Sequence, residues 1–401
     1  MYLLFAFQNQ LKILIIKVFT LNVKMSLRER FLNACWDSDL VNVKDCLKKG
    51  VDVNTVGVSQ SALGRGWDTW SGLKVAAFKD YPELLDLLLS QPGINVNLPT
   101  RHVRSFGSEW TPLMFACQMG NHEIVRKLLQ MPGIDILNKD DDGWTALHVA
   151  ANWGNSKCLE ELAKVPGLEW SCKDIDGQTP LYLALLNGHP DCVRIIASQP
   201  RVDVAVKTNH GQTLVEAALE DYDDEDLSNG MPWHESIKIL ADVHEVDWNV
   251  KMSTGDTPIM HCLNHGNTNM LEILAKSPWA NLNIQDDDGD TPVIWCLKNE
   301  MMEGLRILLD CPRVELGSAI TWALEKKQMN IVERLGQALG RRQVDAKNRF
   351  NMSWRGGASG SAGMREEMSK IKIRLQLESY RKKIYQSAQK MVESNNNYEE
   401  K

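Results

Sequence analysis

Apolar residues in this chain form short clusters separated by polar turns, and this alternation repeats along most of its length. Residues 140–173 (DDDGWTALHVAANWGNSKCLEELAKVPGLEWSCK) show one unit of the pattern. The opening Asp-Asp-Asp-Gly predicts a turn, because aspartate and glycine favour the backbone angles that turns need. Leu147, Ala150 and Ala151 follow at helical spacing. They predict a short helix with a narrow face of small residues.

The second half of the unit predicts another short helix. Gly154 ends the first helix, and Cys158, Leu159 and Leu162 then follow at the i, i+1, i+4 spacing of a buried stripe. Pro166-Gly167 stops this second helix. Two short helices and a turn cannot bury their apolar faces alone, so the core is completed only when another copy stacks against them.

A threonine before each first helix marks the copies. Its hydroxyl is placed to accept a backbone amide bond one turn into the helix. In four copies a proline follows, where a helix tolerates a missing N–H. The threonines are Thr111, Thr145, Thr179, Thr213, Thr257 and Thr291, spaced by 34 residues except for one step of 44. A fixed period of this length predicts a solenoid of stacked units.

These residues resemble the ankyrin repeat, whose hallmark is Thr-Pro-Leu-His followed by two alanines and a glycine. The fullest matches are residues 145–154 (TALHVAANWG) and 179–188 (TPLYLALLNG). A degenerate copy begins at Ser71. Only His148 keeps the histidine of the hallmark, which leaves open how the other copies bond to their neighbours.

The resemblance covers about residues 27–340, with a starting cap before Ser71 and a closing cap over residues 319–339. It implies an all-α ankyrin solenoid of about seven repeats with short β-turn fingers. It further implies that a protein partner is held on the concave surface formed by the fingers and the first helices.

Two insertions interrupt the array and predict exposed loops. One lies at Leu98–Gly107 and the other at Glu220–Pro232, which includes the acidic run 220–226 (EDYDDED). The run lacks the ligand order of a dedicated calcium loop. It is interpreted as a solvated loop, with a contact for a basic partner or a weak cation site as the alternatives.

The flanks differ in composition from the array. Residues 1–24 are apolar but interrupted by Gln, Asn and Lys, so we expect neither a membrane-spanning helix nor a signal peptide. Because Met25 is typical of a cytosolic start, we expect residues 1–24 to be disordered or absent from the mature protein, with a membrane-surface anchor as the alternative. The predicted order is then the array with its caps (25–346), a Gly/Ser-rich linker (347–363), an amphipathic helix (364–394) and a disordered tail (395–401). That helix is either isolated or serves self-association or docking.

The charge of the array indicates the class of partner, and the cysteines indicate the cellular compartment. Residues 26–346 contain 46 acidic and 30 basic side chains. This excess disfavours nucleic-acid binding by the array, since phosphate contacts need Lys and Arg, and it suits a basic protein partner. Nine cysteines without a CxxC pair predict free thiols in a reducing compartment. We therefore expect the cytoplasm, with the nucleus as the alternative, and no contact with a membrane.

No motif for catalysis or a cofactor is recognisable: the chain lacks a phosphate loop, a nucleophile elbow and a His-Glu-x-x-His pair. The nearest approach to a metal site is His261, Cys262 and His265, where the two histidines share a helix face. Cys262 occupies the slot that Ala150 fills in its repeat, so a core position is favoured over zinc. We expect no enzyme, no cofactor and no metal.

Tryptophan and methionine indicate the binding surface. Trp110 and Trp144 precede capping threonines, while Met119 and Trp153 stand at the ends of first helices. In ankyrin repeats these slots line the concave surface, and the residue types are those of interface hot spots. The aspartates expected to project from the neighbouring fingers are Asp141, Asp142 and Asp176. The alternative is that each indole packs on the loop of its neighbour.

Together these features predict a non-catalytic intracellular scaffold or adaptor that binds a protein partner on its concave face. Affinity is expected from the tryptophans and specificity from the aspartates. The alternative is a regulatory inhibitor or targeting subunit whose acidic array masks a basic segment of an enzyme or transcription factor. High salt would weaken that second kind of complex much more than a tryptophan-based contact.

Overall fold

The computed structural model describes residues 25–57, 69–101, 109–220, 233–244 and 246–341. The chain divides into two units, residues 1–326 and 327–401, and each is described by itself. The predictions for the N-terminal segment, the linker, the C-terminal helix, the tail and most of the acidic run concern residues outside the described ranges. In the second unit, residues 329–341 are helical.

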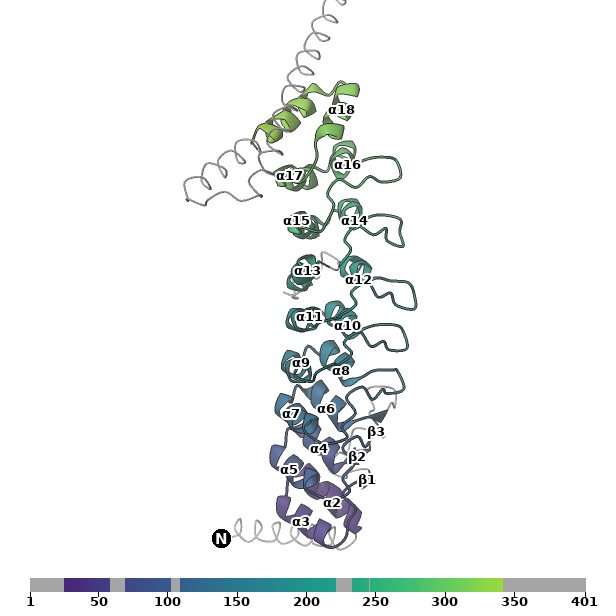
Figure 1. Ribbon diagram of the computed structural model, residues 1–401, viewed down its shortest axis with the longest axis vertical. Helices are drawn as coiled ribbons and strands as arrows, with labels where there is room; N and C mark the ends of the chain where they lie inside the picture. Colours follow the sequence, from purple (N-terminus) through teal and green to yellow (C-terminus); the bar gives the residue numbers. More distant parts are fainter. Residues whose placement is uncertain (1–24, 58–68, 102–108, 221–232, 245, 342–401) are drawn as a thin grey trace, which may run out of the picture. The chain divides into compact units, whose positions relative to one another are not determined.

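The first unit is built of helix pairs that follow one another in chain order (Figure 1). The first helices are α2 (Leu27–Trp36), α4 (Gly72–Lys79), α6 (Pro112–Met119), α8 (Ala146–Asn152), α10 (Pro180–Leu186), α12 (Leu214–Glu220), α14 (Pro258–Asn264) and α16 (Pro292–Lys298). The second helices are α3 (Leu40–Lys48), α5 (Pro82–Leu89), α7 (His122–Leu129), α9 (Ser156–Ala163), α11 (Pro190–Ala197), α13 (Trp233–Ala241), α15 (Thr268–Lys276) and α17 (Met302–Asp310). α18 (Gly317–Glu325) follows. Helices pack on their equivalents in the next pair, as α6 does on α8 and α7 on α9, from α4 and α5 onward. The predicted helical solenoid is confirmed.

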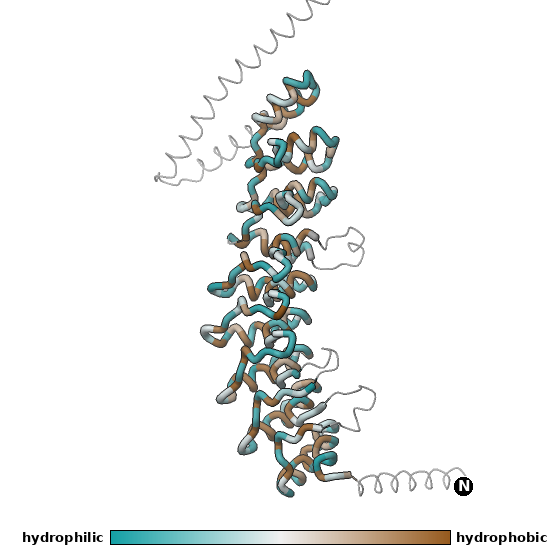
Figure 2. The backbone as a smooth tube through the Cα atoms, turned by 90° about the vertical axis from the view of Figure 1, so that its right-hand side faces the viewer, coloured by the Kyte–Doolittle hydropathy of each residue, from teal (hydrophilic) through white to brown (hydrophobic). Residues whose placement is uncertain are grey.

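Local chemistry forms the pairs as the sequence predicts. The Thr111 hydroxyl accepts from the Met114 amide at 3.4 Å, and the Thr179 hydroxyl accepts from the Tyr182 amide at 3.3 Å. The stripe of Cys158, Leu159 and Leu162 is fully buried. Figure 2 shows apolar and polar residues interleaved along the helix pairs. Stacking therefore supplies the core that a single pair lacks.

Between pairs the chain turns outward in a finger, and in three of the fingers one aspartate organises the turn. Asp140 Oδ1 accepts from the backbone N–H of Trp144 at 2.7 Å and of Asp142 at 3.0 Å. Asp174 and Asp286 make the same pair of bonds in their own fingers. These side-chain bonds fix the turn because they satisfy N–H groups that a helix or sheet would otherwise pair.

Two fingers near the N-terminus are β-hairpins. β1 (Val56–Gly57) pairs antiparallel with β2 (Trp70–Ser71), and β3 (Thr100–Arg101) with β4 (Glu109–Trp110). Residues 102–108 join β3 to β4, so the first insertion falls within a finger. The second joins α12 to α13 and falls within a helix pair. The two insertions therefore occupy different places in the repeat.

The slot of the hallmark histidine is filled by different side chains, and four of them bond to the next repeat. These are Lys74, His148, Tyr182 and Glu216. Lys74 and His148 bond to the carbonyl oxygens of Arg101 and Gln178, respectively. The Tyr182 hydroxyl donates to the Gln212 side chain, and the Glu216 carboxylate accepts from the Ser253 N–H. The cross-repeat bond that the sequence left open is thus made by residues of different chemistry.

Gly154, which ends α8, gives a prediction about stability. Gly154 has φ 71°, and a Cβ added to it would lie 2.6 Å from Nδ1 of His189. The His189 ring is itself held in place, because its Nε2 lies 3.1 Å from the Asn152 carbonyl oxygen. We expect Gly154→Ala to lower the free energy of unfolding by about 2 kcal/mol, through backbone strain and this clash. Denaturant unfolding measures the loss. Gly133→Ala is the control, because Gly133 has φ 79° and open space around it. Equal losses in the two variants would contradict a role for the clash.

Candidate functional site

Trp110 lies in the core. Its side chain is 1% exposed, and its Nε1 donates to Asp140 Oδ2 at 2.7 Å. Its ring meets those of Phe115 and Trp153 with centroids 5.5 and 5.8 Å apart. The expectation that Trp110 is exposed on the binding surface is therefore wrong. The side chain ties its own repeat to the next finger.

The reason for this burial is the residue that covers the ring. Trp153, from the following repeat, lies against Trp110 edge-to-face. One repeat later the slot of Trp153 is held by Asn187, a shorter side chain whose Nδ2 donates to Asn152 Oδ1 at 3.0 Å. Trp144 is only half-buried.

Met119, Trp144 and Trp153 form what we term the apolar patch. Met119 is 44% and Trp153 36% exposed. Each stands eight residues after its capping threonine, so the two occupy the same place in successive repeats. Trp144 meets Trp153 edge-to-face with ring centroids 5.8 Å apart. Three of the four apolar residues that the sequence assigned to the surface are therefore at least partly exposed, and two of them are in contact.

The predicted aspartates lie on the adjoining fingers. Asp141 and Asp176 are exposed, whereas Asp142 is half-buried. Main-chain bonds join the fingers, because the Ile175 N–H donates to the Asp142 carbonyl at 3.1 Å. Contact of these aspartates with a partner remains a prediction.

Ile175 adds exposed apolar surface that sequence reasoning missed. It stands at the tip of the finger that Asp174 organises, in the slot that Asp141 and Asp287 fill in other fingers. The signal was an apolar residue in a turn that is otherwise polar.

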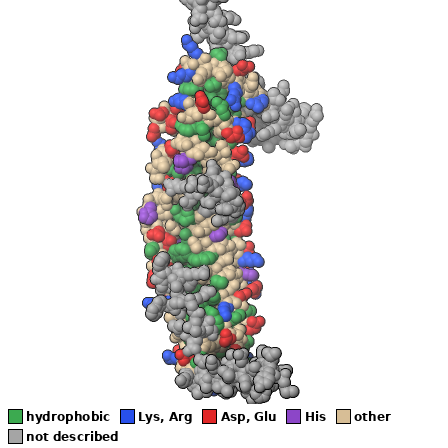
Figure 3. Space-filling view, turned by 180° about the vertical axis from the view of Figure 1, so that it is seen from behind, with side chains coloured by type: hydrophobic (Ala, Val, Ile, Leu, Met, Phe, Trp, Pro, Cys, Tyr) green, Lys and Arg blue, Asp and Glu red, His purple; other side chains and the backbone are tan. Residues whose placement is uncertain are grey.

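The finger carboxylates differ in their electrostatics. Burial raises the pKa of Asp140, and hydrogen bonds from the Trp144 backbone and the Trp110 indole offset part of that rise. Asp140 is thus a structural carboxylate, whereas Asp141 and Asp176 are exposed. On the face of the molecule seen in Figure 3, acidic and basic side chains are interspersed.

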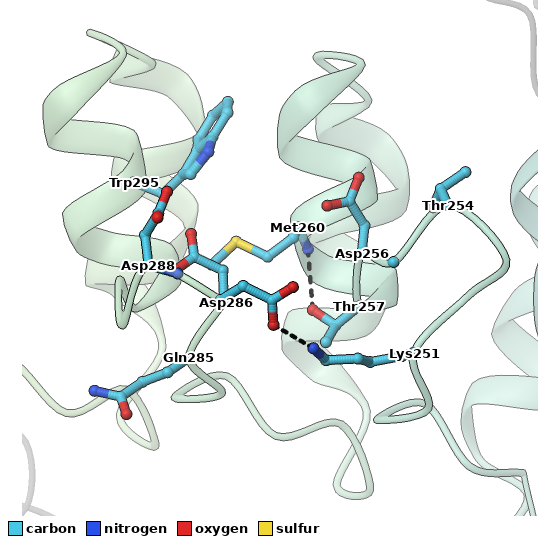
Figure 4. A pocket seen from close by; sticks show the side chains of 11 residues that line it. Lys251, Thr254, Asp256, Thr257, Met260, Gln285, Asp286, Asp288 and Trp295 are labelled. Carbon is cyan, nitrogen blue, oxygen red and sulfur yellow. Dashed lines mark hydrogen bonds and ion pairs between the residues drawn. The ribbon is translucent and has the colours of Figure 1, made fainter.

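A pocket of about 290 Å³ lies between two later fingers (Figure 4). Its walls are the finger that ends at Asp256, the finger of residues 286–290, and the first turns of α14 and α16. The residues that line it are Lys251, Thr254, Gly255, Asp256, Thr257, Met260, Gln285, Asp286, Asp287, Asp288 and Trp295. The sequence did not indicate this site, because its members are spread over two repeats.

The residues weighed as a metal site belong to the core and its edge. Cys262 is buried, as predicted, and burial raises the pKa of its thiol. The His261 and His265 rings lie 4.1 Å apart. Within the described ranges, no group of three His, Cys, Asp or Glu residues is placed to hold a metal ion.

None of the described helices has the length and apolar character needed to cross a bilayer.

A comparison with protein families agrees with this architecture. A family model described as ankyrin repeats (3 copies) matches residues 73–174, 152–225 and 227–319. Among solved structures, the ankyrin repeat domain of Bcl-3, described as a unique member of the IkappaB protein family, is 20% identical. That match covers 59% of this chain and 96% of the Bcl-3 chain, with a TM-score of 0.44. No curated protein matches.

Proposed function

Since this chain belongs to the ankyrin repeat family, we propose that it is a non-catalytic scaffold or adaptor that binds a protein partner on the surface of its fingers and first helices. Ankyrin repeats are in general protein–protein interaction modules and typically non-catalytic. The observation that carries the proposal is the apolar patch, in which Met119 and Trp153 remain exposed beside two fingers.

The patch suits a protein interface for two physical reasons. Tryptophan and methionine are enriched at interfaces, where burying them removes a large apolar area from water. The neighbouring carboxylates of Asp141 and Asp176 supply a polar rim. We assign affinity to the patch and specificity to the rim.

The double variant Met119→Ala/Trp153→Ala tests the proposal. We expect the affinity for the partner to fall by about thirtyfold, the effect of losing a hot spot of about 2 kcal/mol. The full chain is used to recover a partner from native lysate, and the purified partner is then titrated against each variant.

The chain offers a matched control. Met302 is 47% and Trp279 38% exposed, and both lie outside the fingers and first helices. Met302→Ala/Trp279→Ala removes similar side chains of similar exposure, and we expect unchanged affinity. Equal losses in the two double variants, or no loss in either, would reject the patch as the binding site.

A regulatory inhibitor or targeting subunit is the second candidate. Its support is the acidic excess of residues 26–346, which suits a basic segment of an enzyme or transcription factor. Raising the salt concentration in the same titration separates the candidates, since a charge-based complex weakens strongly and a patch-based one does not. We place either activity in the cytoplasm or nucleus, supported by nine cysteines that are all free thiols.

A further inference from the structure

The pocket between the last two complete fingers has an apolar floor and acidic sides. Met260, on α14, is buried and closes the floor, while Trp295, on α16, is half-exposed. Figure 4 shows the Trp295 ring and the Asp256 carboxylate on opposite sides of the Met260 side chain. An aromatic side chain and a carboxylate thus line the same small cavity.

Trp295 breaks the pattern of its slot. It stands four residues after its capping threonine, where two earlier repeats place the buried residues Val149 and Leu183. An indole is larger than either side chain, and part of the Trp295 ring lines the pocket. The exposed ring surface therefore belongs to the pocket and not to the repeat core.

The charges of the pocket are unbalanced. Four of the lining residues are aspartates and one is a lysine, Lys251, which pairs with Asp287. Asp286 Oδ1 is engaged by the backbone N–H groups of Asp288 and Asp290, at 3.0 and 2.8 Å. Asp288 is exposed, and Asp256 is half-buried with an Asn264 Nδ2 donor at 2.8 Å. The pocket keeps a net negative charge at its rim.

We propose that this pocket binds an arginine side chain from a basic segment of the protein partner, an inference that rests on the proposed protein-binding function. The guanidinium is planar and weakly hydrated, so it stacks on an indole while donating to carboxylates beside it. Trp295 supplies the stacking face, and Asp256 and Asp288 supply the acceptors. Lysine carries the same charge, but it lacks the planar fork.

The size and ligand geometry argue against other occupants. A volume of about 290 Å³ is at the lower end of small-molecule sites, and it suits one long side chain. A calcium ion needs about six to eight converging oxygens. Here Asp286 is occupied by main-chain donors and Asp287 by Lys251. One organic cation on one protein segment fits the chemistry better.

The test is a selection of short displayed peptides on the full chain. Each selected peptide is then synthesised with arginine, lysine or citrulline at the enriched position, and its affinity is measured. We expect arginine to be enriched, and citrulline to weaken binding about tenfold or more because the charge-assisted bonds are lost. Asp256→Asn/Asp288→Asn should cause a similar loss, and Trp295→Leu a smaller one of about threefold.

Glu160→Gln/Asp191→Asn is the control for general charge, because it removes two exposed carboxylates on the second helices α9 and α11. Circular dichroism confirms that each variant is folded. Selected peptides without arginine, or affinities unchanged in Asp256→Asn/Asp288→Asn, would overturn the assignment. Testing the same peptides on Met119→Ala/Trp153→Ala separates the two proposals. Loss of binding there alone rejects the arginine pocket and keeps the proposed function, whereas no loss in either variant rejects both.

Discussion

Trp110→Ala is expected to lower the free energy of unfolding by about 4 kcal/mol, the range for emptying a buried aromatic site. The indole is buried, packs on Phe115 and Trp153, and donates to Asp140. Its loss leaves a cavity and removes the donor to a buried carboxylate, which adds to the cost. Denaturant unfolding of the full chain, followed by circular dichroism, measures the change.

Two comparisons isolate the cause. Trp110→Phe keeps an aromatic ring but not the N–H, so we expect a loss of about 1–3 kcal/mol. Trp153→Ala removes an indole that is 36% exposed, and we expect about 1 kcal/mol. Repeat arrays can unfold in parts, so the midpoint of the first transition is compared among variants. A Trp110→Ala variant as stable as Trp153→Ala would contradict the core assignment.

Acidification is expected to destabilise the protein through His148. The ring is fully buried, and burial lowers its pKa to about 4. Nδ1 lies 3.1 Å from the Thr145 N–H, and Nε2 lies 3.3 Å from the Gln178 carbonyl oxygen. These partners suit a neutral ring with its proton on Nε2. A second proton, on Nδ1, would point at another donor.

The direction of the pH effect follows from this lowered pKa. Below about pH 6.5 the unfolded chain protonates His148 while the folded chain does not, so the unfolded state gains protons and stability falls. The titration of His148 therefore lowers the free energy of unfolding as the pH falls from about 6.5 to about 4. The full decrease relative to pH 7 is about 3 kcal/mol.

A variant separates His148 from the carboxylates that also titrate in this range. His148→Gln retains a donor and an acceptor but has no charge change, so its unfolding free energy should vary less with pH than that of the parent. His122→Gln, at the start of α7, is the control. Identical pH profiles for the parent and His148→Gln would contradict the prediction.

The fold was predictable because its signals are local. The capping threonines, the stripe of Cys158, Leu159 and Leu162, and Gly154 each depend on neighbours within one helix pair. A fixed period then extends the result along the chain. Sequence alone was sufficient for the architecture.

The site was less predictable because exposure depends on contacts between repeats. Trp110 and Trp144 hold the same slot, but Trp110 is buried against Trp153, whereas Trp144 is half-buried. The next repeat has Asn187 in the slot of Trp153. The pocket under Trp295 likewise needs two repeats to form. Both differences depend on side-chain size at positions far apart in the sequence.

Hydrogen exchange of the full chain, alone and with its purified partner, shows directly which surface the partner covers. We expect slowed exchange in residues 109–121 and 141–155, which contain the apolar patch and the adjoining finger. We expect unchanged exchange in the second helices α7 and α9. Protection confined to α7 and α9, or to residues outside the fingers and first helices, would contradict binding on this surface.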